Sequence, residues 1–243
     1  MQNVEAWEWL YHEPLVHLPM AFLRNAKSAL IAGGGTLNAL RELAKYSEIR
    51  RIILVEIDRD VLEATLSVSP ALRGLCHDPR VTVIHGNAYE FIKATSEHFD
   101  VIINDACDLT VIPGAKGIIR TLYAHLTTIG VCADVVYRHT AETNCTLRML
   151  ELTAFCAQRA VALIFVPEYP GTLHFLVMWG KNAALHQGIR STRNLEQQRW
   201  VANDHSPCLY YEPKNLRYFL HIPQYLQRIF GKHLPSLVKR TAE

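Results

Sequence analysis

Two acidic residues follow an apolar stretch of the sequence, where they could bind a substrate and accept a proton. Asp105 and Asp108 come directly after Phe99 to Asn104, an apolar run typical of a buried parallel strand. Open α/β sheets bind ligands at the carboxyl ends of such strands. Two carboxylates there would attract a cationic substrate, and one could take its proton, because neighbouring acids raise one another's pKa. The alternative is a turn in which Asp105 only caps the next helix.

A glycine turn and a third acid indicate a nucleoside site. Gly33, Gly34 and Gly35 follow the apolar run from Ala29 to Ala32, and without a Cβ they let the backbone turn sharply beside a ligand. Glu56 ends the next apolar run about 20 residues later, the interval at which nucleotide-binding βαβ units place an acid on ribose hydroxyls. The pattern is GGGTLN rather than GxGxxG, which favours a nucleoside with a short tail, such as S-adenosylmethionine, over a dinucleotide. The alternative is an ordinary glycine-rich turn with a solvated acid.

A third strand end contributes a polar side chain to the same predicted edge. Asn87 and Ala88 follow the apolar run from Val81 to Ile84. In this fold class the tip of that strand lies beside the base of a bound adenosine, and an asparagine amide can bond an adenine edge. Gly86 and Asn87 also read as a generic turn, so the two interpretations stay open.

The alternation of short apolar runs with amphipathic segments predicts an α/β fold, a mostly parallel sheet with helices on both faces. Further strands are expected over Gly130 to Val136, Val161 to Val166 and Leu173 to Trp179. The last two are separated by a short turn from Glu168 to Gly171, which favours an antiparallel pair. We therefore predict a Rossmann-like, methyltransferase-type sheet that ends in an antiparallel hairpin.

Proline and apolar spacing set the expected helices. Residues 3 to 24 read as a helix interrupted at Pro14. A helix from Val61 is expected to end at Pro70, and a long one is expected from Glu142 to Ala157. We expect one catalytic domain over residues 1–243. Its predicted parts are an entry helix (1–26), the nucleoside-binding sheet core (27–180) and a C-terminal helical segment (181–243).

Composition narrows the class of protein. Of 243 residues, 49% are apolar, enough for a sizeable core, and the formal net charge of +2 gives no electrostatic reason to expect nucleic acid or an anionic membrane as a partner. The six cysteines form no CxxC pair and no Cys/His zinc spacing, so we expect no metal site. We also expect the protein to be reduced and cytoplasmic. The sequence does not open with the basic and apolar segments of a signal peptide. It also contains no run of about eighteen apolar residues, the length needed to span a membrane.

Over nearly its whole length the chain resembles the polyamine aminopropyltransferase family, the spermidine synthases. The matching segments occur in the same order as in the family, and together they are more specific than any one of them. They are YHEPLVHLP at 11–19, LIAGGGTLNALREL at 30–43, LVEIDRDVLE at 54–63, DPRVTVIHGNAYEFI at 78–92, FDVIINDACD at 99–108, VPEYPG at 166–171 and YYEPKNLRYFLHIPQYL at 210–226.

The resemblance implies an activity and a set of roles. Family members transfer an aminopropyl group from decarboxylated S-adenosylmethionine, a co-substrate, to an amine such as putrescine. The products are spermidine and methylthioadenosine, and no cofactor or metal takes part. On the nucleoside side the glycine turn packs against the donor, Glu56 would hold the ribose hydroxyls, and Asn87 with Ala88 would contact adenine.

The amine side follows from the same resemblance. Asp105 would accept the proton of the attacking amine, and Asp108 would bind the diamine's ammonium. Tyr11, His12 and Tyr169 would line this side of the site. The family tends to form dimers and tetramers, so the partners implied are a diamine, an adenosyl sulfonium donor and, as an open expectation, a second copy of the chain.

The sequence departs from the family in three places. The glycine motif is usually GGGDGG, and the neutral Thr36 stands where its acid helps to hold the aminopropyl group or the substrate amine. Leaving a buried ammonium without its charged partner typically costs ~2–5 kcal/mol. The loop after Asp108 also differs from the usual DPxGPAxxLF, and the chain begins shortly before the YHE segment, so we expect most of the family's N-terminal β-domain to be absent from this sequence. Two alternatives therefore remain, a non-catalytic nucleoside- or polyamine-binding relative and an S-adenosylmethionine-dependent methyltransferase.

Overall fold

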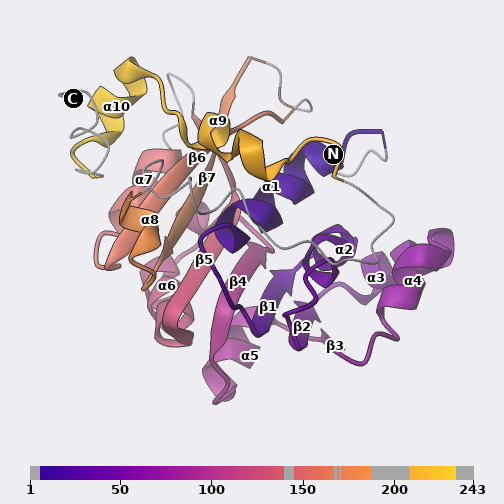
Figure 1. Ribbon diagram of the computed structural model, residues 1–243. Coiled ribbons are helices and arrows are strands. Elements are labelled where there is room, and N and C mark those ends of the chain that lie inside the picture. The colour runs from indigo at the N-terminus through magenta and orange to yellow at the C-terminus, as the bar shows by residue number, and fades with distance from the viewer. Residues whose placement is uncertain (1–5, 140–144, 167–168, 170, 188–207, 234–243) are drawn as a thin grey trace.

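The computed structural model of the protein describes residues 6–139, 145–166, 169, 171–187 and 208–233. Its strands are β1 (Ser28–Gly33), β2 (Arg51–Glu56), β3 (Val81–His85), β4 (Phe99–Asp105), β5 (Leu126–His139), β6 (Gln158–Ile164) and β7 (Leu173–Gly180). They form one seven-stranded sheet in the order β3-β2-β1-β4-β5-β7-β6 (Figure 1). Strands β1 to β5 pair in parallel, whereas β7 is antiparallel to β5 and to β6. The predicted mostly parallel sheet with a C-terminal antiparallel pair is confirmed.

Helices connect and cover these strands. They are α1 (Trp9–Met20), α2 (Asn38–Ala44), α3 (Arg59–Val68), α4 (Pro70–Leu75), α5 (Ala88–Ala94), α6 (Ala115–Ala124), α7 (Cys145–Leu152), α8 (Ala184–Gln187), α9 (Leu216–Leu220) and α10 (Gln224–Phe230), with 3₁₀ turns η1 (Leu109–Val111) and η3 (Pro213–Asn215). Among the described residues, no helix has the length and apolar character needed to cross a bilayer.

The sheet separates two apolar cores. Helices α1, α2 and α9 pack on one face, and α5, α6, α7 and α10 pack on the other (Figure 1). Because alternate residues of a strand point to opposite faces, neighbouring β4 residues enter different cores, Ile103 the first and Ile102 the second. The same alternation sends Asn104 and Asp105, at the end of β4, to opposite faces.

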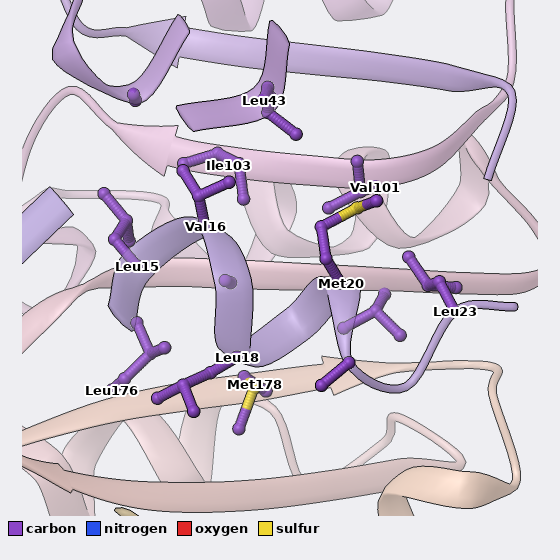
Figure 2. Close-up of a cluster of buried hydrophobic side chains, with 14 of the residues drawn as sticks. Leu15, Val16, Leu18, Met20, Leu23, Leu43, Val101, Ile103, Leu176 and Met178 are labelled. Carbon is purple, nitrogen blue, oxygen red and sulfur yellow. The ribbon is translucent and has the colours of Figure 1, made fainter. Parts of the chain in front are cut away.

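Helix α1 is continuous through Pro14, so the expected interruption there is wrong. Residues 11–20 are all buried, so the helix is enclosed on every side and is held by tertiary packing rather than by its own propensity. Figure 2 shows Val16 and Met20 beside Ile103 and Val101 of β4. This packing offsets the hydrogen bond that Pro14 cannot make.

Two other helix boundaries differ from expectation. Helix α3 ends before Pro70 as predicted, but Pro70 then opens a further helix, α4, at the position where proline is well tolerated. Helix α7 ends at Leu152, short of the predicted Ala157. The hydroxyl of Thr153 donates to the carbonyls of Met149 and Leu150, and such a bond competes with helix continuation. The predicted start at Glu142 lies outside the described residues.

Candidate functional site

The carboxyl ends of β1, β2 and β4 lie side by side, since the register pairs Gly33 with Asp105. A cavity of about 440 Å³ opens at this edge of the sheet. Five of the predicted site residues line it, namely Gly33, Glu56, Asn87, Ala88 and Asp105. The carboxyl ends of β1, β2 and β4 and the start of α5 therefore meet at one ligand-sized cavity.

Glu56 is held by backbone donors at the rim of this cavity. Its Oε2 accepts from the Gly35 N–H at 2.9 Å, and its Oε1 accepts from the Asp58 N–H at 2.8 Å. The predicted relation between the glycine turn and the acid is therefore a direct contact. Each carboxylate oxygen retains a further lone pair, so the oriented side chain can still accept from two neighbouring hydroxyls.

The glycines are required by this close packing. Gly33 has φ +82°, and a Cβ built there would lie 2.6 Å from the Ala106 Cα, while one on Gly35 would lie 2.9 Å from the Glu56 Cγ. Gly34 has φ +78° and lies against the Asp105 side chain. Side chains at these positions would push β1 away from β2 and β4 and distort the cavity rim.

We expect Gly33→Ala to lower the free energy of unfolding by about 2–4 kcal/mol, because a left-handed backbone and an overlap with Ala106 act together. Gly117→Ala is the matched control, since Gly117 lies in helix α6 with open space around its Cα. There the change should be within about 1 kcal/mol and favour the folded state. Urea denaturation of both variants measures the difference, and equal effects would contradict this account of Gly33.

Asp105 is bonded to the helix that crosses behind it. The Tyr11 hydroxyl donates to Asp105 Oδ1 at 2.9 Å. Burial raises the pKa of Asp105, although the charge of His12 and the bond from Tyr11 act in the opposite direction. A carboxylate with a raised pKa is better suited to accept a proton near neutral pH than an exposed one.

The alternative reading of Asp105 as a helix cap is wrong, because Asp108 has that position. Asp108 Oδ1 accepts from the backbone N–H of Thr110 at 2.7 Å and from its hydroxyl, and so caps the turn η1. One oxygen of Asp108 is thus engaged locally, and the residue lies outside the cavity walls.

His12 lies behind Tyr11 and is almost fully buried. Its Nδ1 is 2.8 Å from Glu8 Oε2, and Glu8 in turn bonds Arg41 at 2.8 Å. Burial opposes protonation of His12, but the bond to Glu8 and the charges of Asp105 and Glu8 outweigh it, so the pKa of His12 is raised. His12 therefore supplies positive charge near Asp105 rather than a wall of the cavity.

Three other predicted residues have local contacts. Asn87 caps α5, its Oδ1 accepting from the N–H of Tyr89 at 2.9 Å, so its turn role is real and its amide N–H₂ is the group left for a ligand. Tyr169 packs against His174 with ring centroids 5.6 Å apart. Thr36 is partly exposed between the glycine turn and α2. Tyr169 and Thr36 do not line the cavity.

A buried polar network next to the cavity was not predicted from the sequence. Asp134 of β5 accepts from the Trp179 indole N–H at 3.0 Å and from the Asn104 amide. The Asn104 Oδ1 accepts from the Tyr89 hydroxyl at 2.8 Å, and Tyr89 and Cys107 both line the cavity. The available signal was an acid inside the apolar run GVCADVV, which is rare in a buried strand.

Burial raises the pKa of Asp134 to about 6, from an ordinary value of 3.8, despite the bonds from Asn104 and Trp179. The folded protein therefore binds this proton more tightly than the unfolded chain, and the stability it gives is present below about pH 4 and lost as the pH rises past about 6. The loss corresponds to about 3 kcal/mol. Between about pH 4 and pH 7, Asp134→Asn should gain that much stability relative to the unaltered protein, measured by urea denaturation. A difference that does not change with pH would contradict this account.

A second cluster of polar atoms joins α1 to α2 and to the C-terminal segment. His17 Nε2, Glu42 Oε2 and Cys208 Sγ lie within 4.8 Å of one another, an arrangement with the donor types of a metal site. The Lys45 ammonium, however, is 2.7 Å from Glu42 Oε2 and occupies the same space. Together with the Glu13 carboxylate, which accepts the backbone N–H groups of residues 209–211, the cluster fastens the C-terminal segment to α1.

Comparison with known proteins agrees with the fold and with the resemblance over most of the chain. The polyamine aminopropyltransferase of Thermococcus onnurineus is 30% identical over 248 residues, which cover 96% of this chain and 80% of that protein. Polyamine aminopropyltransferase 1 of Aquifex aeolicus is 38% identical over 108 residues, 44% of this chain and only 39% of that protein. A crystal structure of spermidine synthase with the transition-state analogue AdoDATO has the same fold, with a TM-score of 0.78 at 24% identity over 95% of this chain and 77% of that one.

The domain model described as "Spermine/spermidine synthase domain" matches residues 8–187, a span that includes all seven strands and every residue placed in the cavity wall. With this match over most of the chain, and with the Thermococcus relative aligned nearly end to end, the protein belongs to the spermine/spermidine synthase family.

Proposed function

We propose that this protein transfers an aminopropyl group from decarboxylated S-adenosylmethionine to a diamine such as putrescine, forming spermidine and methylthioadenosine. The observation that supports this best is the pairing of Glu56, oriented for hydroxyl groups, with Asp105, a half-buried carboxyl of raised pKa, on one cavity. Relatives that bear the name polyamine aminopropyltransferase support the same reaction.

The nucleoside would lie in the cavity between β2 and α5. The Glu56 carboxylate would accept from the ribose hydroxyls, and the Asn87 amide with the Ala88 backbone would contact the adenine edge. The glycine turn of Gly33, Gly34 and Gly35 would let the donor approach β1 closely. Apolar wall residues such as Val55 and Ile118 would cover the base.

The amine would approach from the side of Asp105. An alkyl ammonium has a pKa near ~10, so it must lose a proton before its nitrogen can attack. Asp105 would take that proton, and the freed nitrogen lone pair would then form the new N–C bond as the C–S bond of the sulfonium breaks. The sulfur leaves as a neutral thioether, so no acid is needed for the leaving group, and the task is positioning and proton removal.

The remaining amine-side roles belong to the same proposal. Asp108 would hold the distal ammonium with the carboxylate oxygen that the η1 cap does not use, and Tyr11, His12 and Tyr169 would frame the amine. Thr36 would leave the donor's own amine without a charged partner, which makes this the position where the binding-only alternative is strongest.

Product analysis tests the proposal. The purified protein receives decarboxylated or ordinary S-adenosylmethionine in separate reactions, with putrescine, longer diamines or spermidine, and the nucleoside products are separated by chromatography. Methylthioadenosine formed only from the decarboxylated donor and an amine is the expected result. S-adenosylhomocysteine from the ordinary donor would establish a methyltransferase instead, and no product from folded protein would favour a binding-only relative.

We further propose that the protein works as a cytoplasmic homodimer with small-molecule partners and without a cofactor or metal. All six of its cysteines are free thiols, in keeping with a reducing compartment. Light scattering on the purified protein measures the oligomeric state, and a monomer at all concentrations would contradict the dimer.

A further inference from the structure

The network behind the cavity begins at a carboxylate that no water reaches. Asp134 is fully buried in β5, with Oδ2 bonded to the Trp179 indole and Oδ1 to the Asn104 amide. An indole N–H only donates, and an ionised carboxylate only accepts. Both bonds therefore point toward Asp134.

Asn104 links Asp134 to the cavity wall through its side-chain amide. It is fully buried on the face of the sheet opposite Asp105, and its amide nitrogen faces Asp134. Its oxygen must then face away, where it accepts from the Tyr89 hydroxyl of α5 at 2.8 Å. The amide nitrogen also donates to the Cys107 carbonyl at 3.4 Å, so a reversed amide would place its oxygen against that carbonyl as well as against the Asp134 carboxylate, the stronger acceptor of the two.

Tyr89 and Cys107 complete the chain inside the cavity. The Tyr89 hydroxyl has one proton, and it goes to Asn104. Its 3.3 Å contact with Cys107 Sγ is therefore made with the thiol as donor. Cys107 lies in the turn between Asp105 and Asp108, so the network reaches the segment that presents the proposed proton acceptor.

We propose that Asp134 is a positioning residue whose negative charge sets the direction of the hydrogen bonds through Asn104 to Tyr89 and Cys107, and so fixes the wall of the nucleoside cavity and the turn after Asp105. The ligand of that cavity rests on the proposed function. The chain of hydrogen bonds does not, because it is made by the protein alone.

The groups around Asp134 add one further donor to the two N–H groups, because the Tyr137 hydroxyl on its own strand also acts to lower the pKa of Asp134. The titratable groups near it are Tyr137 and Cys132 on its own strand, Cys156 after α7 and Asp108 in the neighbouring turn. None of these four is cationic. The charge is thus compensated by the donors of Trp179, Asn104 and Tyr137 and by no cation among these groups, which ties the orientation of the Asn104 amide to it.

Asp134→Asn should reverse the bonds from Trp179 to Cys107 Sγ, with the loss only of the long Asn104 bond to the Cys107 carbonyl. The new amide keeps an oxygen for Trp179 and turns its nitrogen to Asn104, which must then present its own oxygen. The Asn104 nitrogen would face the Tyr89 oxygen, and the Tyr89 proton would turn to Cys107. A donor aimed at the sulfur stabilises its thiolate, so Cys107 becomes more reactive.

The experiment follows the alkylation of Cys107 by iodoacetamide in the full-length protein at pH 8, read by mass spectrometry of its peptide. Asp134→Asn should raise the rate roughly tenfold, and Tyr89→Phe in that background should abolish the increase. Asp100→Asn is the matched control: this acid lies at the other end of β4, bonded to the Lys27 N–H and the Thr127 hydroxyl. An unchanged rate in Asp134→Asn, or an equal rise in Asp100→Asn, would overturn the proposal.

A second readout links the network to the ligand. Methylthioadenosine should bind Asp134→Asn roughly three- to tenfold more weakly than it binds the unaltered protein. Its affinity for Asp100→Asn should equal its affinity for the unaltered protein. If the unaltered protein binds no adenine nucleoside, the proposed function fails while the alkylation result still decides the network. If Asp134→Asn does not fold, the network can be tested in the unaltered protein by following its NMR resonances against pH. The Trp179 indole and Asn104 amide resonances should shift together near pH 6 as Asp134 ionises, and independent shifts would overturn the proposal.

Discussion

Replacing Asp105 with asparagine is expected to lower the turnover number roughly a hundred- to ten-thousandfold, the usual contribution of a general base. The amide is the same size and can still accept from Tyr11, but it cannot take a proton from the attacking amine. Affinity for methylthioadenosine should stay within about threefold, because Glu56 and the α5 side of the cavity are unchanged. Single-turnover product formation and calorimetric titration measure the two quantities separately.

Asp108→Asn is the matched control for Asp105, since it neutralises an acid in the same turn. It should act mainly on the KM for the diamine, roughly ten- to a hundredfold, because its proposed role is to hold an ammonium rather than to move a proton. Turnover by Asp105→Asn at the normal rate would remove Asp105 as the proton acceptor. If Asp105→Asn instead changed only the KM for the diamine, Asp105 would be the residue that binds the ammonium and not the proton acceptor.

Glu56→Gln is expected to weaken methylthioadenosine binding roughly ten- to a hundredfold, the value of hydrogen bonds to a charged group. The Gly35 and Asp58 N–H groups bond to different carboxylate oxygens, so the single amide oxygen can accept from only one of them and offers the ribose less than the carboxylate does. Titration with the 2′-deoxy nucleoside identifies the contact. Loss of the 2′-hydroxyl should weaken binding to the unaltered protein and have little further effect on Glu56→Gln.

Asp58→Asn provides the comparison for Glu56, because Asp58 lies two residues further on and caps α3 outside the cavity walls. Its affinity for the nucleoside should be normal. Equal losses in the two variants would mean that Glu56 acts through the fold of the β2–α3 turn and not on the ribose.

The parts of the site that depend on local rules could be predicted from the sequence. The apolar runs gave the strands because buried parallel strands need no polar alternation. The interval from Gly35 to Glu56 predicted their proximity, and the structure turns it into a 2.9 Å hydrogen bond. Both features are settled within one βαβ unit, so no distant contact was needed.

Features that depend on distant contacts could not be predicted. Helix α1 continues through Pro14 because residues 11–20 are buried by packing against elements far along the chain. The partners of Asp134 come from β4 and β7, and nothing in GVCADVV specifies them. Which of Asp105 and Asp108 caps the next turn was likewise decided by the geometry of η1.

Leu37 shows how such contacts override a local preference. The sequence favours a helical conformation there, yet Leu37 has φ +62°, a left-handed geometry that costs a side chain about 1–2 kcal/mol. Its side chain is fully buried, and that burial contributes about 1.5–3 kcal/mol. Burial thus offsets the strain, and the glycine turn keeps its shape.

A crystal structure of the protein with methylthioadenosine and putrescine tests the central claim most directly. We expect the ribose hydroxyls on the Glu56 carboxylate, the adenine edge at Asn87, and an amine nitrogen within hydrogen-bonding distance of Asp105. A nucleoside bound elsewhere, or an amine that does not approach Asp105, would contradict it.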